Sequence, residues 1–168
     1  LGVDYEVFMG TSFSKIHAIN RDVKLVKGDW DILLNISDDQ LPIIKGYDDV
    51  IRGATPEELD SSLWFLDGHQ HDIITQEILG RKYYDNQGYI YYPEYKSFFC
   101  DNESTEVAKK NGKLIKISNC IIKHYHPVWG ANEHIKEDDL YRRNDAHWQH
   151  DQSLFHFRKT NNFNNVQA

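Results

Sequence analysis

The pattern of hydrophobic and polar positions along the chain predicts alternating strands and helices. Residues 3–9 (VDYEVFM) alternate apolar and polar side chains, which is typical of a short strand. Residues 11–26 predict a helix that begins at a Ser or Thr cap and carries Ile16, Ile19 and Val23 on one face. Residues 29–37 (DWDILLNIS) form a nearly continuous apolar run, as expected for a strand buried on both faces of a parallel sheet. This order favours an α/β architecture.

The rest of the chain continues in the same way. We expect a helix or turn and then a loop in 45–62, a strand in 62–70, a helix interrupted by Gly80 in 74–88 and strand-like residues broken by Pro93 in 89–99. Residues 101–112 predict a helix, because acids open it, lysines end it and Gly112 follows. One or two strands in 113–126 and an amphipathic helix within 139–159 complete the pattern. We assign 1–132 to one domain, 133–160 to its helical extension and 161–168 to a flexible tail.

Composition and charge reduce the number of possible classes of function. The 168 residues suffice for one domain, and the formal charge is −7 with Lys and Arg scattered along the sequence. Non-specific duplex binding normally needs a basic face. The two cysteines lack a CxxC spacing, which fits a reducing compartment and a cytoplasmic protein. No apolar run approaches the roughly 20 residues of a membrane span, and no signal-peptide pattern opens the chain. Because the chain opens without Met, inside what reads as an ongoing element, we expect a fragment or a processed product.

The adjacent acids Asp38 and Asp39 follow the apolar run of residues 29–37. In open α/β sheets, ligands bind at the carboxyl ends of the strands. A hard divalent cation would offset the mutual repulsion of the two acids, because it prefers carboxylate oxygens. Mg²⁺ or Mn²⁺ held in this way usually bridges to substrate phosphates. The simpler alternative is a solvated turn with a capping Asp.

Two further groups of polar residues could carry chemistry. His124 and His126 would lie on the same face of a strand and could bind one metal, or they could be ordinary hydrogen-bonded histidines. Asp101 and Glu103 open the helix expected at 101–112, where they could cap it or supply a general base. Signatures of dinucleotide binding, P-loops, serine esterases, zinc proteases and EF-hands are absent from the sequence.

In this order, the segments resemble a GT-A-fold glycosyltransferase of the broad family 2 type, in a bacterial or phage-like version. Four matches within residues 3–130 carry the resemblance: SKIHAINRDV, WDILLNISDDQ, DNESTEVAKKNG and IIKHYHP. They are similar, respectively, to the helix before the metal strand, the strand that ends in DxD-type acids, the acceptor-side helix and the late strand with a metal-ligand His. Cys100 stands where the family usually has Glu, and the family's first strand and helix have no counterpart ahead of Leu1.

The resemblance implies a GT-A-like mixed sheet flanked by helices and a set of site residues. Asp39 would bind Mn²⁺ or Mg²⁺, with His124 as a further ligand and His126 as its alternative. Asp101 would be the catalytic base, with Glu103 as the following acid. The expected donor-binding residues are Asp38, Lys15, Asn20, Trp64 and Asp67.

The implied reaction moves a sugar from a nucleotide-sugar donor, with a UDP-sugar expected, to an acceptor hydroxyl of a glycan, with inversion. Three alternatives stay open. The chain could be a non-catalytic remnant that binds sugar or a partner, or a metal-dependent hydrolase. It could also be a phage enzyme that glycosylates a modified DNA base, using a local basic patch at Arg142, Arg143, Arg158 and Lys159.

Overall fold

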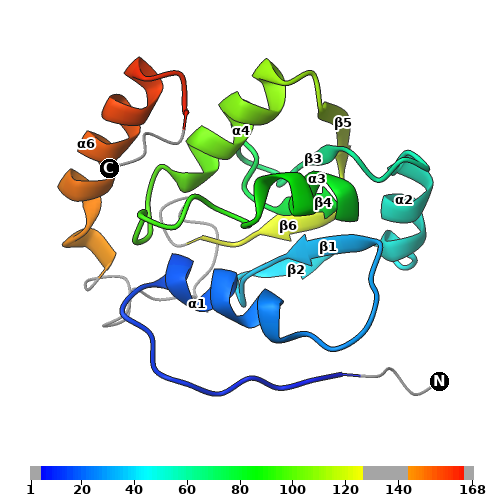
Figure 1. Ribbon diagram of the computed structural model, residues 1–168. Helices are drawn as coiled ribbons and strands as arrows, with labels where there is room; N and C mark the ends of the chain where they lie inside the picture. Colours follow the sequence, from blue (N-terminus) through cyan, green and yellow to red (C-terminus); the bar gives the residue numbers. More distant parts are fainter. Residues whose placement is uncertain (1–4, 127–143, 165–168) are drawn as a thin grey trace.

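A computed structural model describes residues 5–126 and 144–164 of the chain. Its main feature is a mixed sheet of four strands in the order β1-β4-β3-β5, flanked by helices (Figure 1). The strands are β1 (Ile32–Asn35), β3 (Ser62–Leu66), β4 (Glu77–Gly80) and β5 (Leu114–Cys120). Only β3 and β5 run parallel, because β4 is antiparallel to both of its neighbours. The α/β class and the mixed sheet expected from the sequence are therefore present.

Alternation along the strands divides the core between the two faces of the sheet, since successive side chains of a strand point to opposite sides. Leu33 and Leu79 pack into one apolar cluster, while the neighbouring residues Leu34 and Ile78 pack into the other. The first cluster also takes side chains from four helices, and the second takes Ile51 from a fifth. Each face of the sheet is thus covered.

The helices that cover the sheet are α1 (Lys15–Asp22), α2 (Tyr47–Ala54), α3 (Arg81–Gln87), α4 (Cys100–Lys110) and α6 (Trp148–Thr160), with a 3₁₀ turn at Val23–Leu25. In Figure 1, α6 lies beside α4, and α2 lies at the far end of the sheet. The Ser14 hydroxyl accepts a hydrogen bond from the backbone N–H of His17 and caps α1, as the sequence predicts. Helix α4 has the expected acids in its first turn and lysines in its last.

A second, two-stranded sheet positions the candidate site. It pairs β2 (Gln40–Pro42) antiparallel to β6 (Ile122–His124), with Gln40 opposite His124. The short turn between β1 and β2 contains Asp38 and Asp39. The pairing therefore joins the segment after the first strand to the last described strand.

Several local predictions are wrong. Residues 5–9 form no strand, and Tyr5, Val7 and Met9 are 84%, 69% and 90% exposed, because no neighbouring strand pairs with them in the described part of the chain. Strand β1 is an edge strand next to an antiparallel partner, and its residues are only half-buried. Residues 89–99 form turns without a strand.

The helix expected in 74–88 is divided at Gly80 into β4 and α3. A Cβ atom at Gly80 would lie 2.3 Å from the carbonyl oxygen of Leu59, so the close backbone approach at this point requires glycine. The helix expected in 139–159 is present as α6, although residues 139–143 lie outside the described residues. No helix in the described ranges is long and apolar enough to cross a membrane.

Candidate metal and acceptor site

The candidate site begins at the turn between β1 and β2. The Ser37 hydroxyl donates a 2.7 Å hydrogen bond to Asp39 Oδ1, and the side chain of Gln40 accepts from the Ser37 N–H. The backbone N–H of Tyr125 donates to the Asp39 carbonyl at 2.8 Å. These bonds tie the turn to β6 and aim the Asp39 carboxylate at the ring of His124.

His124 lies between two carboxylates that come from different strands. Its Nε2 is 3.2 Å from Asp39 Oδ2, and its Nδ1 is 3.5 Å from Asp67 Oδ2. Asp39 and His124 are 85 residues apart in sequence. The ring of His126 has its centroid 5.5 Å from that of His124. The structure thus brings Asp39, Asp67 and the two histidines into one region.

Asp67 follows β3 and is 1% exposed. Its Oδ1 accepts hydrogen bonds from the backbone N–H groups of His69 and Gln70, at 2.8 and 2.7 Å. Its Oδ2 accepts a 2.8 Å hydrogen bond from the Thr75 hydroxyl and faces His124. The sequence prediction gave Asp67 a donor-binding role and did not foresee its contact with His124. The available signal was its place at the end of a buried apolar run, like that of Asp39.

The charges in this region shift the pKa values of His124 and Asp67. Burial opposes protonation of His124, but hydrogen bonds and the charges of Asp39 and Asp67 outweigh it and raise the pKa of His124 to about 9. Burial alone would raise the pKa of Asp67. The contacts of its carboxylate with His124, Gln70, His69 and Thr75 outweigh burial and hold that pKa well below its usual range. Asp67 is therefore a stable carboxylate at neutral pH.

Asp101 and Lys15 lie within electrostatic reach of this region. Asp101 is in the first turn of α4, and its Oδ1 accepts from the backbone N–H of Asn102 at 2.9 Å. Burial raises the pKa of Asp101, while that N–H and the positive charges of Lys15 and His124 act in the opposite direction. Helix α4 therefore carries a partly desolvated carboxyl group whose pKa the charge of His124 affects.

Glu77 is a buried acid that sequence reasoning missed, because it stood inside an expected helix. It opens β4 opposite Asn35, is 0% exposed, and neither carboxylate oxygen has a hydrogen-bond partner among the described residues. Burial raises the pKa of Glu77 to about 8, against the opposing effect of the Ser104 hydroxyl and with a further rise from the charge of Asp101.

Several other predicted site residues make contacts within the fold. Both oxygens of Glu103 accept hydrogen bonds from Arg158 of α6. Asn20 holds the backbone of residues 90 and 91 through both atoms of its amide. Trp64 is 2% exposed on β3, and the Lys116 ammonium lies 3.6 Å from the centre of its ring. Asp38 is exposed in the turn before β2.

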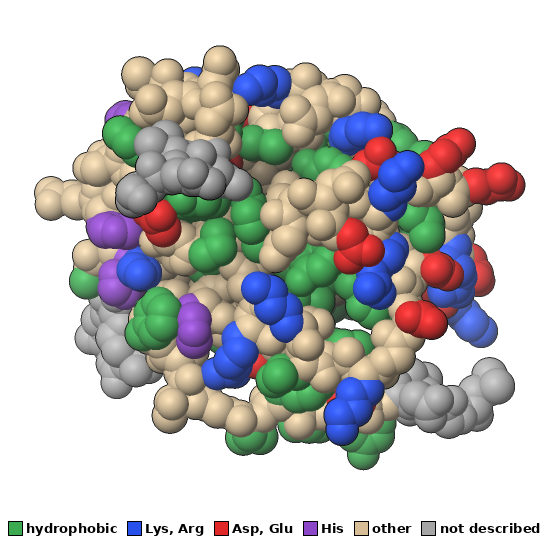
Figure 2. Space-filling view, viewed as in Figure 1, with side chains coloured by type: hydrophobic (Ala, Val, Ile, Leu, Met, Phe, Trp, Pro, Cys, Tyr) green, Lys and Arg blue, Asp and Glu red, His purple; other side chains and the backbone are tan. Residues whose placement is uncertain are grey.

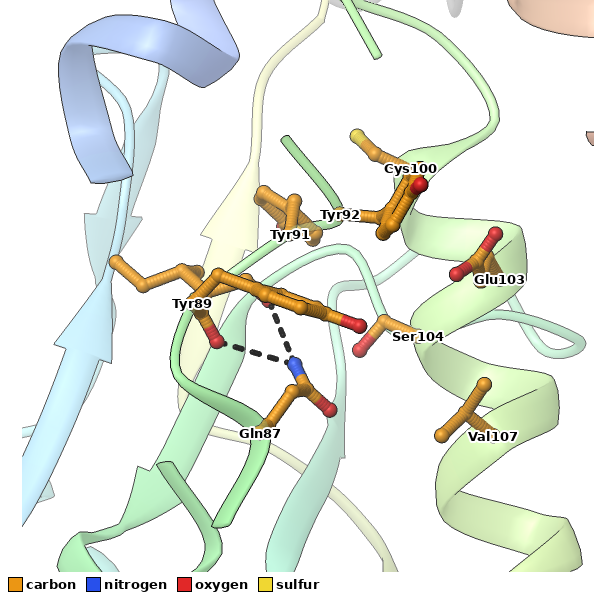
Figure 3. Close-up of a pocket in the computed structure, with 9 residues that line it drawn as sticks. Gln87, Tyr89, Tyr91, Tyr92, Cys100, Glu103, Ser104 and Val107 are labelled. Atoms are coloured by element: carbon orange, nitrogen blue, oxygen red, sulfur yellow. Dashed lines mark hydrogen bonds between the residues drawn. The ribbon is translucent and has the colours of Figure 1, made fainter. Parts of the chain in front are cut away.

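A small hollow lies between α4 and the segment after α3 (Figure 3). Figure 3 shows the Tyr89 ring and the Gln87 amide on one side and Ser104 and Val107 of α4 on the other. Gln87 donates to the backbone carbonyls of residues 89 and 90, which holds this wall in place. Asp39 and His124 do not line this hollow, so it is separate from the candidate metal site.

The basic patch considered for DNA binding is not present as a unit in the described residues. Arg158 is 3% exposed and is paired with Glu103, while Arg142 and Arg143 lie outside the described residues. On the face shown in Figure 2, Lys and Arg side chains are interspersed with Asp and Glu.

Within residues 5–126 and 144–164, no group of three or more His, Cys, Asp and Glu side chains is arranged to hold a metal ion. The contact that could contribute ligands is the pair Asp39 Oδ2 and His124 Nε2. No protein-family model, no curated protein and no solved structure matches this chain.

Proposed function

We propose that the protein is a metal-dependent glycosyltransferase that moves a sugar from a nucleotide-sugar donor to an acceptor hydroxyl, with inversion at the anomeric carbon. The observation that supports this function is the contact between Asp39 Oδ2 and His124 Nε2. These two residues belong to different segments of the sequence, and each was assigned to the metal by its resemblance to a glycosyltransferase motif. Two unrelated surface residues that are 85 positions apart in sequence would not be expected to contact each other.

The residues present fit a divalent cation of the Mn²⁺ or Mg²⁺ type. Asp39 offers a hard carboxylate oxygen and His124 an imidazole nitrogen, a combination that suits Mn²⁺ better than Mg²⁺. Two protein ligands are enough for such an ion in an enzyme that handles diphosphates, because phosphate oxygens and waters fill the remaining positions. When bound, the cation would neutralise the negative charge that develops on the departing nucleoside diphosphate.

Asp101 is the group that we assign to the acceptor. A general base must reach the proton that it abstracts and must have a pKa near the working pH. Burial raises the pKa of Asp101 in that direction, while the positive charges of Lys15 and His124 act to lower it. Deprotonation of the attacking hydroxyl by Asp101 would leave the oxygen free to displace the diphosphate. We place the reaction in the cytoplasm, where Cys100 and Cys120, both free, stay reduced.

The test is release of nucleoside diphosphate from a panel of nucleotide sugars, UDP-sugars first, with Mn²⁺ or with a chelator. We expect turnover that requires the metal and falls by at least about 100-fold in Asp39→Asn and in Asp101→Asn. Asp49→Asn is the control for Asp39→Asn, because it removes an exposed carboxylate of α2 that is not part of the candidate site, and we expect it to leave turnover unchanged.

The two variants separate the two roles. Turnover without a metal, or an Asp39→Asn variant with normal turnover, would refute the metal assignment. A normal rate in Asp101→Asn would remove that residue as the base. Tight binding of a UDP-sugar with no transfer to any acceptor would favour the non-catalytic alternative.

A further inference from the structure

We propose that Asp151 of α6 is a positioning residue, which holds the segment before α4 so that Asp101 is presented to the acceptor hydroxyl. This inference rests on the proposed function, because it concerns the residue that is assigned there as the general base. Asp151 itself touches no substrate in this proposal, since it is 0% exposed and acts through the backbone of residues 96–98.

The carboxylate of Asp151 accepts hydrogen bonds from three consecutive backbone N–H groups. The N–H groups of Ser97 and Phe98 both donate to its Oδ2 at 2.8 Å, and the N–H of Lys96 lies 3.1 Å from Oδ1 and 3.2 Å from Oδ2. His150 Nδ1 is a further contact, 2.8 Å from Oδ1. Successive N–H groups that converge in this way form an anion-binding concavity, and a hydrogen bond to a carboxylate is stronger than one between neutral groups. Asp151 is the anion that fills this concavity, so it fixes the segment against α6.

The start of α4 depends on this segment, because no side chain caps the helix locally. The N-cap residue is Phe99, whose side chain makes no capping hydrogen bond. Phe99 has a φ of 59°, in the left-handed region that bulky residues rarely adopt and that persists only where the surrounding structure enforces it. Its ring packs against Trp148 and Phe155 of α6, with centroid distances of 4.9 and 5.8 Å. The same helix therefore holds both the segment before α4 and the residue at which α4 begins.

Asp101 lies two residues after Phe99, so the conformation of this turn sets the direction of its carboxylate. The Phe99 carbonyl accepts a hydrogen bond from the N–H of Glu103 at 3.0 Å, and Asp101 Oδ1 accepts from the N–H of Asn102 at 2.9 Å. A general base must lie within hydrogen-bond reach of the proton that it removes. A displacement of about 1 Å can lower the rate by about 100-fold. A loosened start of α4 should therefore slow the reaction.

The substitution Asp151→Ala removes the acceptor of all three N–H groups. In the nucleotide-sugar assay, we expect kcat to fall by about 100-fold and KM for the donor to change by less than about threefold, because a displaced base slows the chemical step and leaves donor binding intact. In an Asp101→Asn background, Asp151→Ala should cause no further fall in kcat, because the residue through which it acts is gone. Lys159→Gln is the matched control, since it removes an exposed ion pair between α6 and Glu106 of α4, and it should keep kcat within about twofold of the wild type.

Amide hydrogen exchange gives a readout that does not depend on turnover. In Asp151→Ala, we expect faster exchange at residues 96–98 and also at Asn102 and Glu103, whose N–H groups are bonded within the first turn of α4. The N–H of Asn111, bonded at the other end of α4, should keep its wild-type rate. If Asp151→Ala does not fold, Asp151→Asn replaces it, because it keeps an oxygen acceptor and loses the charge. We then expect kcat to fall by about 3- to 10-fold.

The outcomes distinguish this inference from the function on which it rests. Absence of turnover in the wild type would overturn both proposals. A wild-type kcat in Asp151→Ala, or faster exchange confined to residues 96–98, would overturn the positioning role and leave the proposed function intact. A further fall in kcat when Asp151→Ala is added to Asp101→Asn would show that Asp151 does not act through Asp101, which would also overturn the positioning role.

Discussion

Two buried ionic clusters in this protein differ in the side chains that they bring together. In one, the carboxylate of Glu103 accepts three hydrogen bonds from Arg158, with distances of 2.7–3.0 Å, and one from the Tyr95 hydroxyl. One negative charge meets one positive charge. In the other, His124 lies between the carboxylates of Asp39 and Asp67.

The difference separates a cluster that joins two helices from the cluster of the candidate site. Glu103 lies on α4 and Arg158 on α6, and the Arg158 guanidinium also stacks 3.2 Å from the centre of the Tyr92 ring. The pair is closed and joins two helices. The other cluster joins the turn before β2, strand β6 and the end of β3 through Asp39, His124 and Asp67, which belong to the candidate site.

The largest effect that we expect is on the closed cluster. Arg158→Met would leave Glu103 buried without a counter-charge, which costs about 3–5 kcal/mol of the free energy of unfolding. Denaturant titration followed by circular dichroism measures this loss. The double variant Arg158→Met, Glu103→Leu should recover most of the stability, because it removes both charges. A loss below about 1 kcal/mol in the single variant would show that the pair does not stabilise the fold.

Ligands should stabilise the protein through the cluster of Asp39, His124 and Asp67 and not through the pair of Glu103 and Arg158. Mn²⁺ and UDP together should raise the free energy of unfolding by about 2.7 kcal/mol at one hundred times the dissociation constant. Thermal unfolding with and without the two ligands measures the gain. Asp39→Asn should abolish this gain. Lys159→Gln, which removes an exposed ion pair between α6 and Glu106 of α4, should retain it. An equal gain in Asp39→Asn would place the ligand elsewhere.

A third buried acid sharpens the comparison, because Glu77 is fully buried and the only charge among those that shift its pKa in the described residues is the negative charge of Asp101. Its folded-state pKa of about 8 lies above the ordinary value of 4.5, so between these values the folded state holds a proton that the unfolded state has released. The free energy of unfolding should then fall by about 1.4 kcal/mol for each pH unit as the pH rises through this window.

Glu77→Gln isolates this effect from that of His124, whose pKa of about 9 also makes stability fall at higher pH. The variant keeps the shape of a neutral carboxyl group, so we expect stability near the wild type at about pH 5 and greater stability at about pH 8. Denaturant titrations at both values measure the change in slope. Parallel pH profiles for the variant and the wild type would mean that Glu77 does not bind a proton on folding.

Local features of the sequence were sufficient for several elements. Ser14 caps α1, acids open α4 and lysines close it, and Gly80 interrupts the helix expected in 74–88. These features follow from the sequence because capping, charge placement and backbone freedom act within a few residues. The alternation in residues 3–9 was misleading for the described residues 5–9, since a strand also needs a partner that alternation alone cannot supply. The helix expected across Gly80 failed for a similar reason, because pairing with β1 and β3 draws Glu77–Gly80 into the sheet.

By itself, the sequence determined which residues could carry chemistry: Asp39, Asp101 and His124 were named from their types and from the motifs around them. Only the tertiary structure decided which of these side chains meet. The β2–β6 pairing puts Asp39 against His124, the end of β3 adds Asp67, and α6 engages Glu103 through Arg158. The physical reason is the distance along the chain over which each kind of interaction acts. Propensity and capping act between near neighbours in the chain, whereas the pairing of buried charges depends on how distant segments pack.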